Sequence, residues 1–134
     1  MNTALKAEDM YKEEILDHYK NPRNCGELKT SDVSHKEYNP LCGDELRMSV
    51  RIEEGKVKEI KFEGNGCAIS QASASMLTEK AKDMSLEEIK KLTKEDIFEM
   101  LAIPIGPVRT KCALLSLDTL KNSIKIYENY GDKK

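Results

Sequence analysis

The sequence predicts an α+β fold in which an antiparallel sheet of about three strands is covered by helices on one face. Residues 45–52 alternate strictly between apolar and polar side chains, which is the pattern of a strand with one buried face. Glu54 and Gly55 then give a turn signal, and residues 57–62 return as the partner strand with Ile60 and Phe62 on one side at period 2, which predicts a hairpin. The segments whose apolar residues have helical spacing are predicted to cover the buried face of the sheet.

Start and stop signals place the elements around this hairpin. Residues 9–20 have apolar side chains at near-helical spacing, with Asp9 as a candidate N-cap, and Pro22 marks the end of that helix. Residues 30–38 are polar and fit an edge strand that leads into the hairpin. Small residues and good helix formers from 68 to 82 predict a helix directly after the second hairpin strand.

The C-terminal half is predicted to be helical with one interruption. Ser85 and Thr93 each precede an acidic residue at the third following position, which is the capping-box signature of two short helices that end near Leu101. The prolines within residues 103–107 force an extended connector. Beyond it, apolar residues at helical spacing predict a final amphipathic helix that runs to about Tyr130.

Length and composition limit the function classes. The 134 residues predict a single domain, 1–134, that is large enough to fold without a metal or disulfide. The 22 Lys and Arg residues balance 24 Asp and Glu residues to a formal net charge of −2, which argues against nucleic acid as the main partner. No stretch has the length of a membrane span and the N-terminus lacks the apolar core of a signal peptide, so we expect a cytoplasmic protein that does not associate with membranes.

Cysteines in a reducing compartment suggest metal or sulfur chemistry rather than disulfides. Cys67 lies between the second hairpin strand and the helix that follows, where the helix dipole and unpaired backbone N–H groups favour a thiolate. Cys112 is expected at the start of the last helix, a second place of this kind, with the positive charges of Arg109 and Lys111 beside it. Cys25 lies in a loop without another candidate ligand nearby.

Cys42 and Asp44 extend this group, because they begin the hairpin strand whose partner ends just before Cys67. Together with Cys112 they offer three soft thiolates and one hard carboxylate, a set that suits either tetrahedral zinc or an iron–sulfur cluster. A carboxylate is the poorer match for an iron–sulfide unit, so such a site would release its cluster readily. From the residues alone, buried packing remains the alternative for each cysteine.

The two histidines are not expected to be ligands. His18 lies on a half-buried or polar side of the first predicted helix, where packing or hydrogen bonding is its usual role. Nothing in the sequence around His35 supports metal binding.

Four segments resemble the U-type iron–sulfur cluster assembly scaffolds, which are the IscU, NifU N-terminal domain and SufU family. They are the His-Tyr-x-x-Pro-Arg-Asn run within residues 11–24, Asn-Pro-Leu-Cys-Gly-Asp at 39–44, Gly-Asn-Gly-Cys-Ala-Ile-Ser at 64–70 with the Gln-Ala-Ser-Ala-Ser-Met that follows, and Pro-Val-Arg-Thr-Lys-Cys-Ala at 107–113. The resemblance implies an IscU/SufU-like fold. It also implies that the family's three cysteine ligands are Cys42, Cys67 and Cys112, and that its cluster-loosening aspartate is Asp44.

By this resemblance the protein is a scaffold that receives sulfur from a cysteine desulfurase, assembles a transient [2Fe–2S] cluster and passes it to apo-proteins. Cys112, and next Cys42, would accept the persulfide sulfur, and Lys111 would stabilise the thiolate or persulfide. Zn²⁺ can occupy the same ligands. A cluster held on an exposed face could also join copies of the chain into a homo-oligomer, and we expect sulfurs that a desulfurase can reach.

Departures from the family pattern leave an alternative open. Lys111 replaces the histidine that IscU-type members usually carry, and Arg109 is also SufU-like, whereas the short spacing from Cys67 to Cys112 leaves no room for the SufU insertion. Residues 105–109 replace the chaperone-binding motif of IscU. The alternative function is therefore that of a zinc-dependent sulfurtransferase. A module built around a structural zinc is disfavoured, because a chain of this length buries an adequate core without metal.

Overall fold

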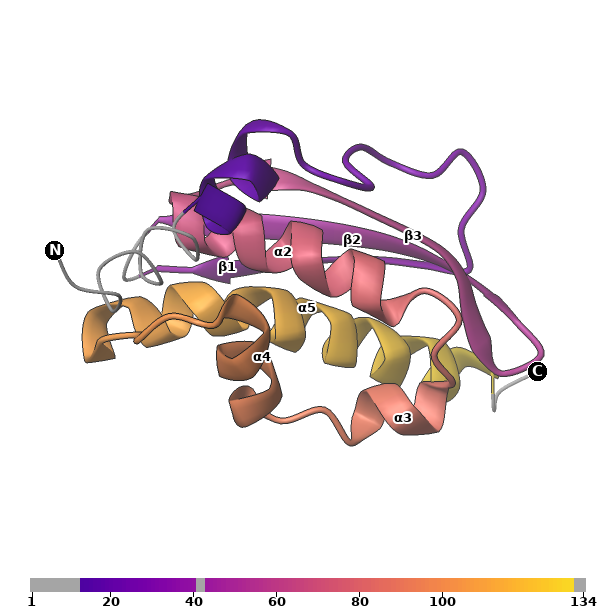
Figure 1. Cartoon of the computed structure of the whole chain (residues 1–134). Coiled ribbons are helices and arrows are strands. Elements are labelled where there is room, and N and C mark those ends of the chain that lie inside the picture. Colours follow the sequence, from indigo (N-terminus) through magenta and orange to yellow (C-terminus); the bar gives the residue numbers. More distant parts are fainter. Residues whose placement is uncertain (1–12, 41–42, 132–134) are drawn as a thin grey trace, which may run out of the picture.

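A computed structural model of the chain describes residues 13–40 and 43–131 (Figure 1). It confirms the α+β architecture with a three-stranded antiparallel sheet in the order β1-β2-β3. The strands are β1 (Val33–Asn39), β2 (Asp44–Glu53) and β3 (Lys56–Asn65). The edge strand that was predicted within residues 30–38 is β1.

One face of the sheet forms the core. The apolar side chains of β2 and β3 face the same side, and Leu46, Met48, Val50 and Phe62 are fully buried there. The turn between these strands has positive φ angles, 53° at Glu54 and 73° at Gly55, a geometry whose twist matches that of a hairpin. The alternation in the sequence therefore predicted both the hairpin and its buried face.

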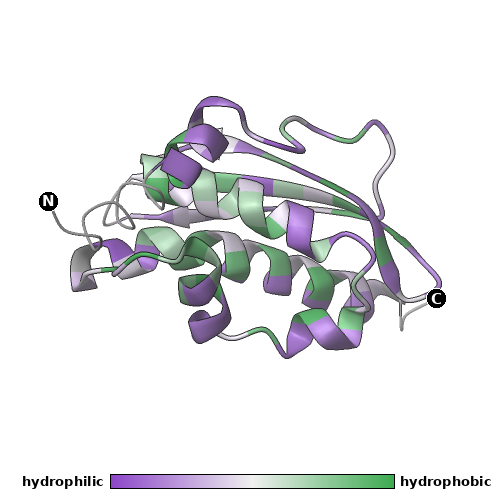
Figure 2. Ribbon diagram, viewed as in Figure 1, coloured by the Kyte–Doolittle hydropathy of each residue, from purple (hydrophilic) through white to green (hydrophobic). Residues whose placement is uncertain are grey.

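Helices α2 (Ala68–Ala81) and α5 (Pro107–Gly131) cover the buried face. In Figure 1 they lie along the sheet, where α2 contacts β3 and α5 contacts β1 and β2. Two shorter helices, α3 (Leu86–Lys90) and α4 (Lys94–Leu101), pack outside this layer, and their outward sides are hydrophilic (Figure 2). No helix within the described residues has the length and hydropathy that a membrane span requires.

Both predicted capping boxes are confirmed. The hydroxyl of Ser85 accepts from the backbone N–H of Glu88, whose carboxylate accepts from the backbone N–H of Ser85. Thr93 and Asp96 exchange the same two bonds at the start of α4. Because these bonds stabilise the charged carboxylates, they lower the pKa of Glu88 and of Asp96 below the ordinary values.

The N-terminal segment is helical over residues 13–20 and is fixed on α2. His18 is buried, and its Nδ1 lies 2.7 Å from the Oγ of Ser75, which also accepts from the backbone N–H of Arg23 at 2.9 Å. These bonds confirm the hydrogen-bonding role that was expected of His18. The part of the predicted helix before residue 13 lies outside the described residues.

The chain then closes the outer edge of β3. The N–H of Phe62 donates to the carbonyl oxygen of Asn24 at 2.9 Å, and the N–H of Gly26 donates to the carbonyl oxygen of Phe62 at 2.7 Å. Further on, the N–H of Leu28 donates to the Oγ of Ser49 at 3.0 Å. The segment thus crosses the sheet face opposite to the helices, which explains why Ser49 is buried on the polar side of β2.

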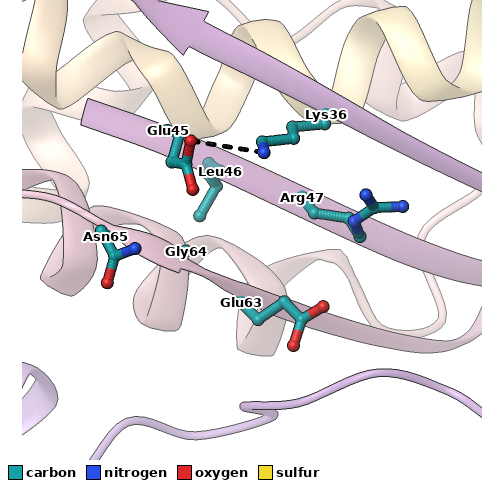
Figure 3. Close-up of a pocket in the computed structure, with 7 residues that line it drawn as sticks. All are labelled: Lys36, Glu45, Leu46, Arg47, Glu63, Gly64 and Asn65. Atoms are coloured by element: carbon teal, nitrogen blue, oxygen red, sulfur yellow. Dashed lines mark ion pairs between the residues drawn. The ribbon is translucent and has the colours of Figure 1, made fainter. Parts of the chain in front are cut away.

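Nearer to the start of β2, that opposite face carries a polar hollow of about 400 Å³ (Figure 3). Lys36 and Glu45 form an ion pair of 3.3 Å across it, and Arg47 donates to the Oγ of Ser34 at 3.4 Å. Glu45 and Arg47 alternate with the buried residues of β2, so the hollow and the helical layer lie on opposite sides of the sheet.

Candidate metal centre

Cys67 is the N-cap residue of α2, as predicted. Its extended backbone, with φ −72° and ψ 169°, joins β3 to the helix, and its side chain makes no capping hydrogen bond to the helix backbone. The backbone N–H of Cys67 instead donates to the Oδ1 of Asp44 at 3.3 Å. The sulfur therefore stays available while the main chain of Cys67 is tied to the start of β2.

Asp44 is the first residue of β2 and is only 4% exposed. The turn before it contains Gly43, with a φ of +73°, whose N–H donates to the carbonyl oxygen of Asn39 at 2.8 Å. Among the described residues, no group donates a hydrogen bond to the buried Oδ2 of Asp44. A buried carboxylate oxygen without a partner is costly, so this oxygen fits a bound cation.

Cys112 comes from α5, but not from its start. The helix begins at Pro107, and Cys112 is its sixth residue, more than one turn inside. The carbonyl oxygen of Gly106 already accepts from the N–H groups of Arg109 and Thr110. The predicted helix-start position was wrong because Pro107 itself suits the first helical position, so the connector ends before it. The dipole argument therefore does not extend to Cys112.

The fold brings Asp44, Cys67 and Cys112 together at one end of the sheet. One ligand atom from each, a carboxylate oxygen and two sulfurs, lies within 4.8 Å of the others. Zinc bonds to sulfur and oxygen are about 2.0–2.3 Å long, so three atoms at these separations can contact one ion. Cys42, the fourth ligand expected from the sequence, lies outside the described residues.

Two residues that shape this group, Gly66 and Ser70, were not predicted from the sequence to have a role in the site. A Cβ on Gly66 would overlap the Oγ of Ser70 and would lie 3.0 Å from the Cγ of Asp44, so the close packing of these two side chains favours glycine here. Ser70 is buried; its hydroxyl donates to the carbonyl oxygen of Cys67 at 3.0 Å and lies 3.9 Å from the Sγ of Cys67. The only signal was the position of a serine three residues after an N-cap cysteine.

The sulfurs differ in exposure. Cys67 is half-buried, whereas Cys112 is buried with 4% of its surface exposed. Among the described ligands the site is therefore less open than expected: Cys67 is partly accessible, whereas the expectation of an exposed, reachable sulfur was wrong for Cys112. The reason is that a cysteine inside α5 turns with the helix toward the sheet, while an N-cap cysteine stays at the rim.

The structure also describes the surroundings of the other residues considered in the sequence, Lys111, His35 and Cys25. Lys111 is exposed and lines a hollow of about 280 Å³ between β1 and α5, together with Glu37 and Asp118. Partial desolvation, and then the nearby charge of Glu37, raises the pKa of Asp118 above its ordinary value. His35 pairs with Glu37 on β1, and Cys25 is exposed on the segment beside β3.

Fold and site together define a class of protein: an α+β domain that gathers two thiols and a carboxylate from separate segments at one end of its sheet. Among solved structures, a NifU-like N-terminal protein from Brucella abortus aligns with a TM-score of 0.76 at 22% identity, over 90% of this chain and 96% of that one. A putative scaffold protein for the SUF system from Fervidobacterium islandicum aligns with a TM-score of 0.74 at 27% identity, over 84% and 94%.

Sequence comparison specifies the family. The model of the NifU-like N terminal domain matches residues 10–134. The Escherichia coli K12 protein named iron–sulfur cluster assembly scaffold protein IscU is 34% identical, over 92% of this chain and 98% of its own length. The Bacillus subtilis protein named zinc-dependent sulfurtransferase SufU is 36% identical, over 92% and 95%. The chain therefore belongs to the NifU-like N-terminal domain family, which confirms the resemblance seen in its motifs.

Proposed function

We propose that this protein is a scaffold on which an iron–sulfur cluster is assembled and from which it is passed on. The observation that carries the proposal is the convergence of Asp44, Cys67 and Cys112, whose ligand atoms lie within 4.8 Å of one another. One of these atoms belongs to the carboxylate of Asp44, whose buried Oδ2 has no hydrogen-bond partner among the described residues. Thiolates are the usual ligands of iron–sulfur clusters. Cys42 would supply the third thiolate.

The cluster is the cargo, and the mixed ligand set suits its release. Sulfur ligands match the soft iron–sulfide unit, whereas the carboxylate of Asp44 is a hard ligand and exchanges more readily. Asp44 also accepts the backbone N–H of Cys67 through Oδ1, which leaves Oδ2 for the metal. One carboxylate can therefore keep its place in the fold while it binds and releases iron.

Sulfur enters from a cysteine desulfurase as a persulfide, and its outer sulfur is reduced to sulfide by an electron donor, which in reconstitution is the thiol present in excess. Apo iron–sulfur proteins are the recipients of the finished [2Fe–2S] cluster. Cys112 is our first candidate for the acceptor, Cys42 the second, and Lys111 would stabilise the negative sulfur. Because Cys112 is 4% exposed, acceptance there requires that desulfurase binding uncover its sulfur. Persulfide labelling by mass spectrometry in Cys112→Ala and Cys42→Ala should show loss of the label in the variant without the acceptor. A label that persists in both would exclude these two candidates.

Anaerobic reconstitution tests the scaffold proposal. Ferrous iron, a desulfurase and cysteine are added to the wild type, Asp44→Ala and Asp44→Asn, and visible absorption and Mössbauer spectra follow the cluster. We expect a [2Fe–2S] signature that transfers to an apo-ferredoxin and lasts longer in Asp44→Ala. Asp44→Asn keeps an oxygen acceptor for the N–H of Cys67, so it separates loss of the ligand from loss of the local hydrogen bond. Asp118→Ala removes a carboxylate outside the group and is the matched control.

The alternative is a zinc-dependent sulfurtransferase. The likeness to the Bacillus subtilis SufU protein favours it, as does the exposed cation Lys111 on the turn that carries Cys112. Zinc bound in the purified protein would not separate the two functions, because the same thiolates bind zinc strongly. Faster sulfur release from the desulfurase in the presence of the zinc form, with no cluster formed, would favour the sulfurtransferase and overturn the scaffold proposal.

A further inference from the structure

A buried hydroxyl lies beside the sulfur of Cys67. Ser70 is the third residue of α2 and is 2% exposed. Its Oγ accepts the S–H of Cys67 at an Sγ–Oγ distance of 3.9 Å and donates its own hydrogen to the carbonyl oxygen of the same residue at 3.0 Å. Once the sulfur has lost its proton to bind a metal, the hydrogen of this hydroxyl has two acceptors on Cys67, the carbonyl oxygen and the sulfur, and rotation about one bond turns it from one to the other.

The carbonyl oxygen of Cys67 does not depend on Ser70. The N–H of Gln71 donates to that oxygen at 3.1 Å, as the first helical hydrogen bond of α2. If the hydroxyl of Ser70 turned to the sulfur, no buried carbonyl would lose its last partner. The Ser70 hydroxyl can therefore donate to the sulfur, when the sulfur is charged, without leaving the carbonyl oxygen of Cys67 unpaired.

The sulfur becomes the stronger acceptor when it carries charge. Hydrogen bonds to ionised groups are shorter and about twice as strong as those between neutral groups. We propose that Ser70 is a positioning residue, whose hydroxyl donates to the sulfur of Cys67 when that sulfur binds a metal ion or cluster. This inference rests on the proposed function in one respect, which is that Cys67 is a ligand.

The consequence is an asymmetric site. Hydrogen bonds to ligand sulfurs withdraw electron density, orient the ligand and raise the reduction potential of a cluster. Cys67 would be oriented by Ser70, whereas Asp44 is the hard and exchangeable ligand on the other side of Gly66. Gly66 lies between both side chains, since a Cβ there would meet the Oγ of Ser70 and the carboxylate of Asp44.

Cobalt is a probe for this contact, because sulfur-to-cobalt charge-transfer bands report the electron density on the ligand sulfur. The full chain is titrated anaerobically with Co²⁺ as wild type, Ser70→Ala and Ser73→Ala. Ser73 is the matched control: it is a buried serine of α2 whose hydroxyl donates to the carbonyl oxygen of Ala113 at 2.8 Å. We expect the band to move to lower energy in Ser70→Ala and to stay in place in Ser73→Ala.

Ser70→Thr keeps a hydroxyl at this position and should restore the wild-type band energy, which a purely structural role would not require. The [2Fe–2S] potential should likewise become more negative in Ser70→Ala. Identical band energies in the wild type and Ser70→Ala would overturn the inference about Ser70 alone. Absence of any thiolate band in the wild type would overturn the metal site together with it, and a normal cobalt band without cluster assembly would overturn the scaffold proposal only.

Discussion

Replacement of Gly66 by alanine should damage the metal centre through a single methyl group. The added Cβ would lie 3.0 Å from the Cγ and 3.1 Å from the Oδ1 of Asp44, and it would overlap the Oγ of Ser70. Both neighbours are buried, so neither side chain can swing into solvent to make room. The Ser70 hydroxyl must therefore move and Asp44 must give way, which disturbs the bond of Asp44 to the backbone N–H of Cys67.

Overpacking of this kind usually costs about 1–3 kcal/mol of the free energy of unfolding. With a urea dependence of about 1–3 kcal/mol per molar, a loss of that size lowers the midpoint of urea unfolding by about 1 M. The same displacement moves one of three ligand atoms, so Gly66→Ala should also bind Co²⁺ more weakly than the wild type. Urea titration followed by circular dichroism and cobalt titration measure the two effects separately.

The double variant Gly66→Ala/Ser70→Ala isolates the cause. Removal of the Ser70 hydroxyl removes the closest obstacle to the new methyl group, so the two changes should cost less together than the sum of their separate costs. Gly106→Ala is the control, because no atom of the described residues would lie within 4 Å of a Cβ at Gly106. Its stability should change by less than about 1 kcal/mol. A Gly66→Ala variant with wild-type stability and cobalt affinity would refute the steric argument.

Three further predictions concern stability. Ala102→Gly should stabilise the protein by about 1 kcal/mol in urea unfolding, because Ala102 ends α4 with a left-handed φ of 58° that glycine adopts without strain; an unchanged midpoint would contradict this. Asp118→Asn should stabilise the protein at neutral pH, because a raised pKa means that the charged carboxylate disfavours the folded state. The gain should shrink as the pH falls toward 3.8, the ordinary pKa of this carboxyl group. A gain that grew in acid would be inconsistent with this prediction. Glu88→Gln should destabilise the protein at neutral pH, because the capping bond to Ser85 favours the charged carboxylate. The loss of unfolding free energy relative to the wild type should disappear as the pH falls from 4.5, the ordinary pKa of this group, through the lower pKa of the folded state. A loss that stays constant over this range would exclude the charge as its cause.

The local elements could be predicted from the sequence because each is specified by nearby residues. The alternation along β2 needs only a buried face, and the capping boxes of α3 and α4 need only a side chain and a backbone group three residues apart. The burial of Ser49 could not be predicted in this way, because it depends on Leu28, 21 residues earlier, which crosses the outer face of the sheet. The left-handed backbone conformation of Ala102 at the end of α4 could not be predicted either, because no glycine occupies that position.

The candidate site was predictable to a similar extent. Hairpin geometry placed Asp44 near Cys67, and the structure brings these two residues and Cys112 together. The position of Cys112 within α5 was wrong by about one turn, because a proline-rich connector and a proline-initiated helix look alike in sequence. Ser70 and Gly66 were missed because their importance lies in the space between side chains, which a motif does not describe.

The pairing of residues 24–26 with β3 also determines how this sheet meets other chains. An uncovered strand edge offers unpaired N–H and carbonyl groups, and it is a template for edge-to-edge aggregation. Here the outward backbone groups of Phe62 are already bonded to Asn24 and Gly26 of the same chain. The N-terminal segment thus protects the outer edge of β3 from pairing with the sheet edge of another chain. Removal of residues 1–28 would expose that strand edge as well as remove a helix.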